Sequence, residues 1–159
     1  MESGAPSHED CCRVKTTACP CPLCGSVGRK VGSVTLDRHV ALPLRGRLGD
    51  EAAFCPNPAC EAVYCSPGRF VVRRGQTVLP VTVKDAGDQV PVCYCFGFTR
   101  GELRRDLAEG GHTDIPDRIR QGVSEGRCAC ESENPQGACC LGNVAGAIKE
   151  LQREAKGRG

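Results

Sequence analysis

The 14 cysteines are the feature that most limits how this chain can fold. They fall into four groups, namely Cys11–Cys24, Cys55–Cys65, Cys93 with Cys95, and Cys128–Cys140. Aromatic residues make up only 4% of the 159 residues, and 31 residues are Gly or Pro (20 and 11). Burial of large apolar side chains can therefore contribute little stability. We expect metal ions or disulfides to hold this fold together.

The amino-terminal segment bears on the choice between metals and disulfides. Met1–Asp10 is polar, and no apolar run of the kind found in a secretory signal follows it. No segment approaches the roughly 20 apolar residues of a membrane span. We therefore expect a cytoplasmic protein, in which thiols stay reduced and clustered cysteines bind metal. A disulfide-rich secreted protein is the alternative.

The net charge of +2, with scattered basic residues, predicts neither a nucleic-acid nor a membrane partner. No Ser-His-Asp or Cys-His constellation and no phosphate-binding loop is present, so we do not expect an enzyme in the strict sense.

The first half of the chain has a strand-like pattern. Short runs of alternating or β-branched residues occur at Val31–Val34, Arg69–Val72 and Val78–Val83. Gly and Pro separate them, as in hairpins. The polar, turn-rich Lys84–Pro91 that follows is interpreted as a linker, which gives a domain boundary near residue 88.

The second half has a helical pattern. Thr99 and Glu102 have the spacing of a capping box, and Gly110-Gly111 is expected to end the helix that begins there. A second helix is expected over Thr113–Val123. The apolar stripe of a final helix consists of Leu141, Val144, Ile148 and Leu151.

Two cysteine pairs in the first half have the spacing of a zinc site. Cys21 and Cys24 form a CxxC knuckle that ends at a glycine, and Cys55 and Cys60 form a longer, proline-containing knuckle. Four thiolates suit a tetrahedral ion, and such closed sites on small hairpins are usually structural zinc. A single iron, or two unrelated cysteine pairs, are the alternatives.

Other residues near this motif have less certain roles. Cys19 could replace Cys21, because both lie within reach of Cys24. The vicinal pair Cys11-Cys12 is either incidental or a trap for a soft ion such as Cu(I). His39 lies between the two knuckles, and we expect a structural role for it in preference to metal binding. Cys65 is left without a role.

The remaining cysteines lie next to the expected helices of the second half. Cys93 and Cys95 precede the capped helix, and the segment from Gly126 to Cys140 precedes the last one. Helix starts present free amides and a positive dipole end, which stabilise thiolates and the negative charge of an iron–sulfur cluster. Two cysteine pairs in such positions predict a [2Fe-2S] cluster.

The predicted fold class is therefore α+β, in three parts. Residues 1–18 are a flexible cysteine-containing tail, residues 19–88 a small zinc-binding β module, and residues 89–155 a short-helix [2Fe-2S] domain.

Residues 19–150, with the motifs CPLCG, FCPNPACEAVYC, CYCFGFT and GRCACESENPQGACCLGN, resemble the amino-terminal region of CopZ-type copper chaperones. In that family a zinc-binding module precedes a bacterioferritin-associated-ferredoxin-like [2Fe-2S] domain. Matched by position, the resemblance implies four cluster ligands, which are Cys93, Cys95, Cys130 and Cys140. Cys128 and Cys139 are the neighbouring alternatives.

The same resemblance implies a metallochaperone-type role in copper handling and one-electron transfer, such as reduction of Cu(II) to Cu(I). The implied cofactors are a [2Fe-2S] cluster, zinc and, as a further option, Cu(I). The implied partners are a separate copper carrier, a copper-transporting ATPase or a redox protein, and a homodimer is also open. Full-length family members carry copper on a Met-x-Cys-x-x-Cys loop, which these 159 residues lack. We therefore expect no copper delivery by that loop. A ferredoxin-like electron carrier and a redox-sensing interaction module, both independent of copper, are the alternative functions.

Overall fold

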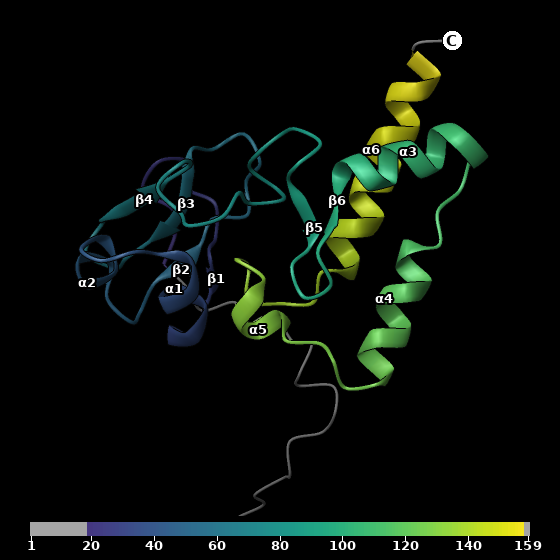
Figure 1. Ribbon diagram of the computed structural model, residues 1–159. Helices are drawn as coiled ribbons and strands as arrows, with labels where there is room; N and C mark the ends of the chain where they lie inside the picture. Colours follow the sequence, from purple (N-terminus) through teal and green to yellow (C-terminus); the bar gives the residue numbers. More distant parts are fainter. Residues whose placement is uncertain (1–18, 158–159) are drawn as a thin grey trace, which may run out of the picture.

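The computed structural model describes residues 19–157, which form two small units side by side (Figure 1). The N-terminal unit contains an antiparallel sheet with the strand order β1-β2-β3-β4. Its strands are β1 (Arg29–Lys30), β2 (Ala53–Phe54), β3 (Ala62–Cys65) and β4 (Val71–Arg73), and its helices are α1 (Ser33–His39) and α2 (Leu44–Leu48). Cys11 and Cys12 lie outside the described residues.

Aromatic and aliphatic side chains between the sheet and α1 form the core of this unit. Phe54 and Tyr64 are opposite each other in the β2–β3 register, and their rings pack edge to face with centroids 5.9 Å apart. Leu36 of α1 is fully buried against this pair's side of the sheet. The core is thus small but closely packed.

Two of the three predicted strands in this half are wrong. Val31–Val34 leads into α1, because Gly32 caps a helix that buries Thr35, Leu36 and His39 at helical spacing. Val78–Val83 contains no strand, since Pro80 has no amide to donate to a ladder. The third prediction is partly confirmed, because β4 begins two residues after Arg69.

The C-terminal unit is a two-stranded hairpin covered by helices. The strands are β5 (Pro91–Cys93) and β6 (Phe98–Thr99), and the helices are α3 (Arg100–Gly110), α4 (Ile115–Ser124), α5 (Cys130–Glu133) and α6 (Leu141–Gly157). The three longer helices confirm the predicted helical pattern, whereas α5 was not predicted. Val144 and Leu151 of the α6 stripe are buried against the hairpin and α3.

The capping box at the start of α3 is also confirmed. The Thr99 hydroxyl accepts from the Glu102 amide, and the Glu102 carboxylate accepts from the Thr99 amide. Thr99→Ala removes the side-chain cap and is expected to lower the free energy of unfolding by about 1 kcal/mol. Denaturant titration of the metal-loaded protein measures this, with Thr99→Ser as the control that keeps the hydroxyl. Equal losses in both variants would contradict the cap's role.

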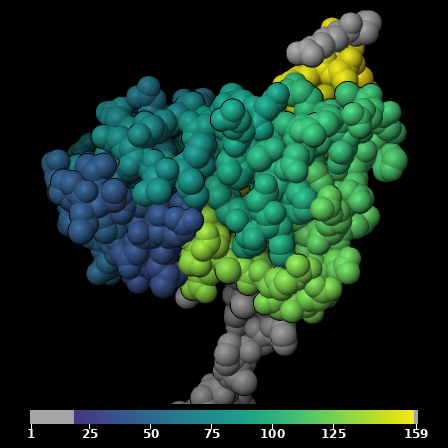
Figure 2. Space-filling view, viewed as in Figure 1, coloured from purple at the N-terminus to yellow at the C-terminus, as the bar shows by residue number. Residues whose placement is uncertain are grey.

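The two units meet at α5, which lies beside α1 (Figure 1) and between the two units in Figure 2. Residues 84–90 connect the units without a helix or strand, as expected of a linker. Lys84 is nevertheless buried, and its ammonium group donates to the carbonyls of Asn57 and Cys60. No helix formed by residues 19–157 combines the length and hydrophobicity that crossing a bilayer requires.

Candidate metal centres

The first cysteine site consists of Cys21, Cys24, Cys55 and Cys60, whose sulfurs lie within 4.8 Å of one another. Cys21 and Cys24 flank a turn closed by the hydrogen bond from the Gly25 amide to the Cys21 carbonyl, with Gly25 at φ 76°. The other two thiols come from the loop between β2 and β3. The structure therefore brings together the four residues predicted to bind zinc.

The spacing of these sulfurs suits a tetrahedral ion. Cys21 Sγ lies 3.8 Å from Cys60 Sγ, and Cys24 Sγ lies 3.6 Å from Cys55 Sγ. Thiolates about 2.3 Å from a central zinc are about 3.8 Å apart in a regular tetrahedron. Cys24 is exposed and the other three are buried, so the site is open on one side only.

Hydrogen bonds and a nearby cation favour thiolates at this site. Hydrogen bonds from the Ser26 side chain and backbone lower the pKa of Cys24 to about 6. Burial raises the pKa of Cys55 to about 12, which the Lys84 charge partly opposes. All four thiols can ionise together only with a cation among them, so metal binding should strengthen as pH rises.

A fifth thiol borders the first site. Cys65 Sγ lies 3.7 Å from Cys21 Sγ, and Cys65 is fully buried at the end of β3. Burial raises the pKa of this thiol. Cys19 Sγ lies 3.8 Å from the Cys65 carbonyl oxygen, on the outer side of the group. Cys65 therefore adjoins the four converging thiols without belonging to their group.

The second cysteine site consists of Cys93, Cys95, Cys130 and Cys140, together with the adjoining Cys128. The sulfurs form a chain of contacts: Cys93 to Cys140 at 3.1 Å, Cys140 to Cys130 at 3.9 Å, Cys130 to Cys95 at 3.4 Å, and Cys130 to Cys128 at 3.3 Å. Cys139 is exposed, whereas its neighbour Cys140 is 1% exposed. The four residues implied by the family resemblance therefore lie together.

The backbone around this site differs from the one predicted in one respect. Cys93 ends β5 and Cys95 lies in the β5–β6 turn, so neither thiol is at the start of α3. The amide that reaches Cys95 Sγ, at 3.1 Å, belongs to Ala129 at the start of α5. Cys140 directly precedes α6, as expected. The amide that donates a hydrogen bond to the Cys95 sulfur thus lies at the start of α5, a helix that the sequence pattern did not predict.

The thiols of the second site compete for protons. Hydrogen bonding to Cys140 lowers the pKa of Cys93 to about 7 and that of Cys130 to about 5. The same hydrogen bonds raise the pKa of Cys140, and burial raises the pKa of Cys95 to about 12. Without a cation the site therefore holds a mixture of thiols and thiolates. A metal group that accepts four thiolates would displace the remaining protons.

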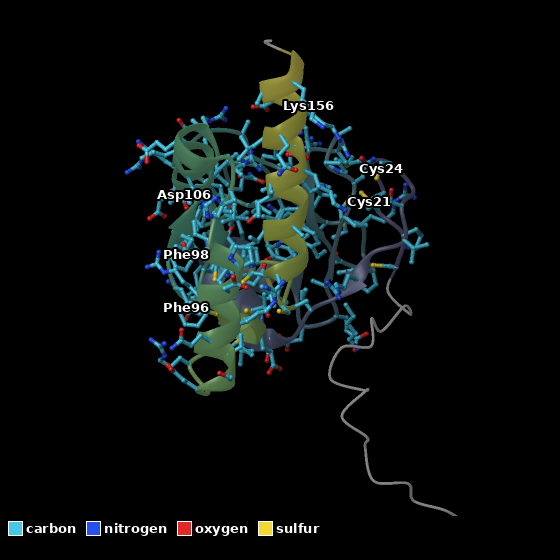
Figure 3. All side chains as sticks on the ribbon, turned by 90° about the vertical axis from the view of Figure 1, so that its right-hand side faces the viewer. Cys21, Cys24, Phe96, Phe98, Asp106 and Lys156 are labelled. Carbon is cyan, nitrogen blue, oxygen red and sulfur yellow. The ribbon has the colours of Figure 1, made fainter. Side chains whose placement is uncertain are left out.

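An aromatic side chain covers the second site towards α4. Phe96 follows Cys95 and packs over Gly122, where an added Cβ atom would lie 2.4 Å from the ring. The Arg127 guanidinium lies 5.7 Å from the centroid of the same ring. Figure 3 shows Phe96 and Phe98 on the opposite side of α6 from Cys21 and Cys24 of the first site. Phe96 adjoins the second site, which therefore lies in the other unit.

No two cysteines within residues 19–157 are joined by a disulfide, which leaves all twelve thiols of this part of the chain free. Within residues 19–157, four cysteine sulfurs converge in the N-terminal unit, and the three of Cys95, Cys128 and Cys130 converge in the C-terminal unit. Converging thiols of this kind are typical of metal-binding proteins.

Comparison with known proteins specifies the class of the N-terminal unit. Residues 18–77 match a CopZ-type family described as a zinc binding domain. The chain is 31% identical over 120 residues to a copper chaperone CopZ of Archaeoglobus fulgidus, a match that covers 76% of this chain and 57% of that protein. The chain therefore spans little more than half the length of this relative.

A solved structure extends the similarity to both units. The X-ray structure of the Archaeoglobus fulgidus CopZ N-terminal domain superposes with a TM-score of 0.62 at 28% identity. The superposition covers 86% of this chain and 97% of that one. The mixed helix and sheet fold of the described residues is thus similar to that of a CopZ N-terminal domain.

Sequence reasoning missed the residues that support the two sites from a distance. Lys84 lies in the segment expected to be a linker, and the sequence predicts no supporting role for Cys65 or Tyr94. His39 is buried, and it belongs to neither converging group of thiols in the described part of the chain. The expected structural role of His39 fits this position. No local pattern could have revealed these contacts, since each joins segments far apart in the sequence.

Proposed function

We propose that the protein is a metallochaperone-type module that holds a structural zinc at the first cysteine site and a [2Fe-2S] cluster at the second. The observation that carries the second assignment is the chain of sulfur contacts that runs from Cys93 through Cys140 and Cys130 to Cys95. The Ala129 amide donates to the Cys95 sulfur at its end. Four thiolates and amide donors are the ligand environment of such clusters.

The pairing of the sulfurs supports a binuclear group over a single ion. Cys93 lies next to Cys140 at one end of the chain of contacts, and Cys95 lies next to Cys130 at the other. Two pairs give each of two irons two protein ligands. The converging group of Cys95, Cys128 and Cys130 alone offers only three sulfurs.

We further propose that the chain acts in copper handling in the cytoplasm. The name of the relative as a copper chaperone supports this, and a bound [2Fe-2S] cluster would supply the one electron that converts Cu(II) to Cu(I). Thiolates bind Cu(I) more favourably than harder ligands do. The partners would be a separate copper carrier, a copper-transporting ATPase or a redox protein that supplies electrons.

Anaerobic purification followed by metal and sulfide analysis tests the two sites. We expect about two irons, two acid-labile sulfides and one zinc per chain, with an S = ½ EPR signal after reduction by dithionite. Zinc without sulfide would contradict the cluster. Stepwise addition of Cu(II) to the reduced protein should then re-oxidise the cluster and yield Cu(I). A cluster that cycles reversibly but ignores copper would instead indicate a plain electron carrier.

A further inference from the structure

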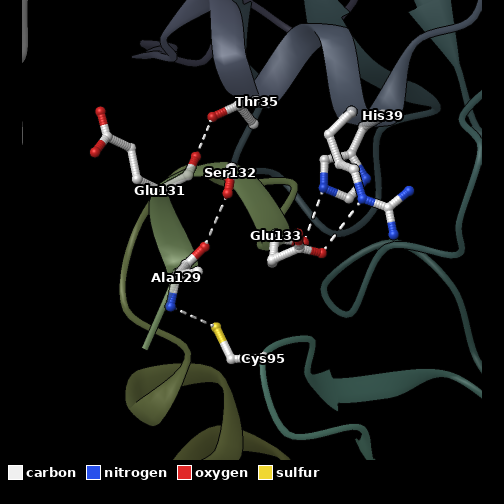
Figure 4. A network of polar contacts seen from close by, with 8 residues as sticks. Thr35, His39, Cys95, Ala129, Glu131, Ser132 and Glu133 are labelled. Carbon is white, nitrogen blue, oxygen red and sulfur yellow. Dashed lines mark hydrogen bonds and ion pairs between the residues drawn. The ribbon is translucent and has the colours of Figure 1, made fainter. Parts of the chain in front are cut away.

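His39 joins the zinc-binding unit to the second cysteine site. It is the last residue of α1 and is fully buried, and its Nε2 lies 2.8 Å from the carbonyl oxygen of Glu133, the last residue of α5 (Figure 4). Because burial lowers the pKa of His39, the ring is neutral at pH 7 and donates from Nε2. Its Nδ1 has no hydrogen-bond partner among residues 19–157, so the Nε2 contact alone fixes the tautomer.

The same ring contacts the other segment that carries cysteines. Tyr94 lies between Cys93 and Cys95, and its ring packs edge-on against that of His39 with centroids 6.0 Å apart. The Tyr94 hydroxyl in turn donates to the Pro80 carbonyl and accepts from the Thr82 amide. One imidazole of the N-terminal unit thus borders both ligand-bearing segments of the second site.

The loop between Cys130 and Cys140 depends on such outside contacts. The helix α5 has only four residues, too few to be stable alone. The Thr35 hydroxyl donates to the Glu131 carbonyl, and the Tyr64 hydroxyl donates to the Pro135 carbonyl. These donors all come from α1 and β3, so the N-terminal unit is the scaffold on which this loop is held.

Burial distinguishes the weak contacts between the two units from the stronger ones. The Arg38–Glu133 ion pair, at 3.3 Å, joins side chains that are 45% and 34% exposed and contributes little. The His39 ring is fully buried and its hydrogen bond to the Glu133 carbonyl is partly buried, so its loss would leave that carbonyl without this partner where access of water is limited. Protein groups that hold a ligand-bearing segment in place commonly affect metal affinity by 10- to 100-fold.

We propose that His39 is a positioning residue for the second cysteine site, so that retention of a metal group there depends on the zinc-binding unit. The proposal deepens, and rests on, the [2Fe-2S] assignment above. His39 acts through α5 and Tyr94 and touches no ligand sulfur. It couples the two centres mechanically, since α1 belongs to the unit that the zinc organises.

Three variants of the full-length chain test the proposal. His39→Leu removes the donor, His39→Gln keeps an amide donor at a similar reach, and His112→Leu is the matched control at an exposed histidine. We expect His39→Leu to retain zinc but to lose its cluster to a chelator about tenfold faster, equivalent to about 1.4 kcal/mol. We also expect a changed EPR signal and reduction potential, with His39→Gln and His112→Leu close to wild type. Wild-type behaviour of His39→Leu, or a failure of His39→Gln to restore it, would overturn the proposal.

Two further measurements separate this proposal from the cluster assignment. Hydrogen exchange of the Asn134 amide, which donates to the Cys130 carbonyl at 3.0 Å, reports on α5 in zinc-loaded protein without a cluster. We expect faster exchange in His39→Leu, and unchanged exchange would overturn the positioning role even where wild type binds no cluster. Should His39→Leu fail to fold, Thr35→Val removes a neighbouring donor with little change in volume. It should raise the same exchange rate, and no effect would again overturn the proposal.

Discussion

Cys130→Ala is expected to reduce bound iron and sulfide at least about tenfold, whereas Cys128→Ala should retain both. Cys130 is buried and its sulfur contacts those of both Cys95 and Cys140. Without it the chain of contacts from Cys93 to Cys95 is interrupted. Cys128 Sγ lies 3.3 Å from Cys130 Sγ and within 4.8 Å of Cys95 Sγ, so it adjoins one end of the chain of contacts. Iron and acid-labile sulfide per chain, measured after anaerobic purification, check this.

The neighbouring pair Cys139 and Cys140 provides the matched comparison. Cys139→Ala alters an exposed thiol and should leave the iron content unchanged, whereas Cys140→Ala should lower it as much as Cys130→Ala does. In each of the two comparisons, the same Cys→Ala change is made at two cysteines that are at most two positions apart in the sequence. Retention of iron in Cys130→Ala with loss in Cys128→Ala would show that the ligand has been assigned to the wrong member of the pair.

Cys60→Ala is expected to remove zinc and to unfold most of the N-terminal unit. Structural zinc in thiolate sites contributes about 10–16 kcal/mol of apparent binding free energy, as large as the 5–15 kcal/mol that stabilises a whole domain. The apolar core of this unit is too small to replace that contribution. Zinc content and hydrogen exchange of the β1–β4 amides measure the effect.

Cys65→Ala is the control for this loss. Cys65 is 1% exposed and lies 3.7 Å from Cys21 Sγ, yet it is outside the group of four converging thiols. The variant should keep its zinc and lose only a modest amount of stability. Zinc loss from Cys65→Ala, with retention in Cys60→Ala, would mean that Cys65 replaces Cys60 as a ligand. Because α1 holds α5, Cys60→Ala should also weaken cluster retention at the second site.

Local chemistry in the sequence determined the features that depend on neighbouring residues. The capping box at Thr99, the apolar stripe of α6 and the stop at Gly110-Gly111 all involve contacts within a few positions. The Cys21–Cys24 knuckle is likewise a local turn. The spacing of the cysteines also pointed to Cys21, Cys24, Cys55 and Cys60, whose sulfurs converge. In the second half the spacing left the choice open, and only the family resemblance singled out Cys130 and Cys140. Whether those residues bind zinc and a cluster stays a prediction.

Tertiary structure alone decided how the two units support each other. Val31–Val34 has the alternation of a strand, but burial of Leu36 in the core and of His39 against α5 and Tyr94 favours the helix that begins at Ser33. The short helix α5 exists because donors almost 100 positions away, such as His39 and Thr35, satisfy its carbonyls. Lys84 is buried because the Asn57 and Cys60 carbonyls accept hydrogen bonds from its ammonium group. The stability of such contacts depends on packing between distant segments, which the pattern of adjacent residues does not encode.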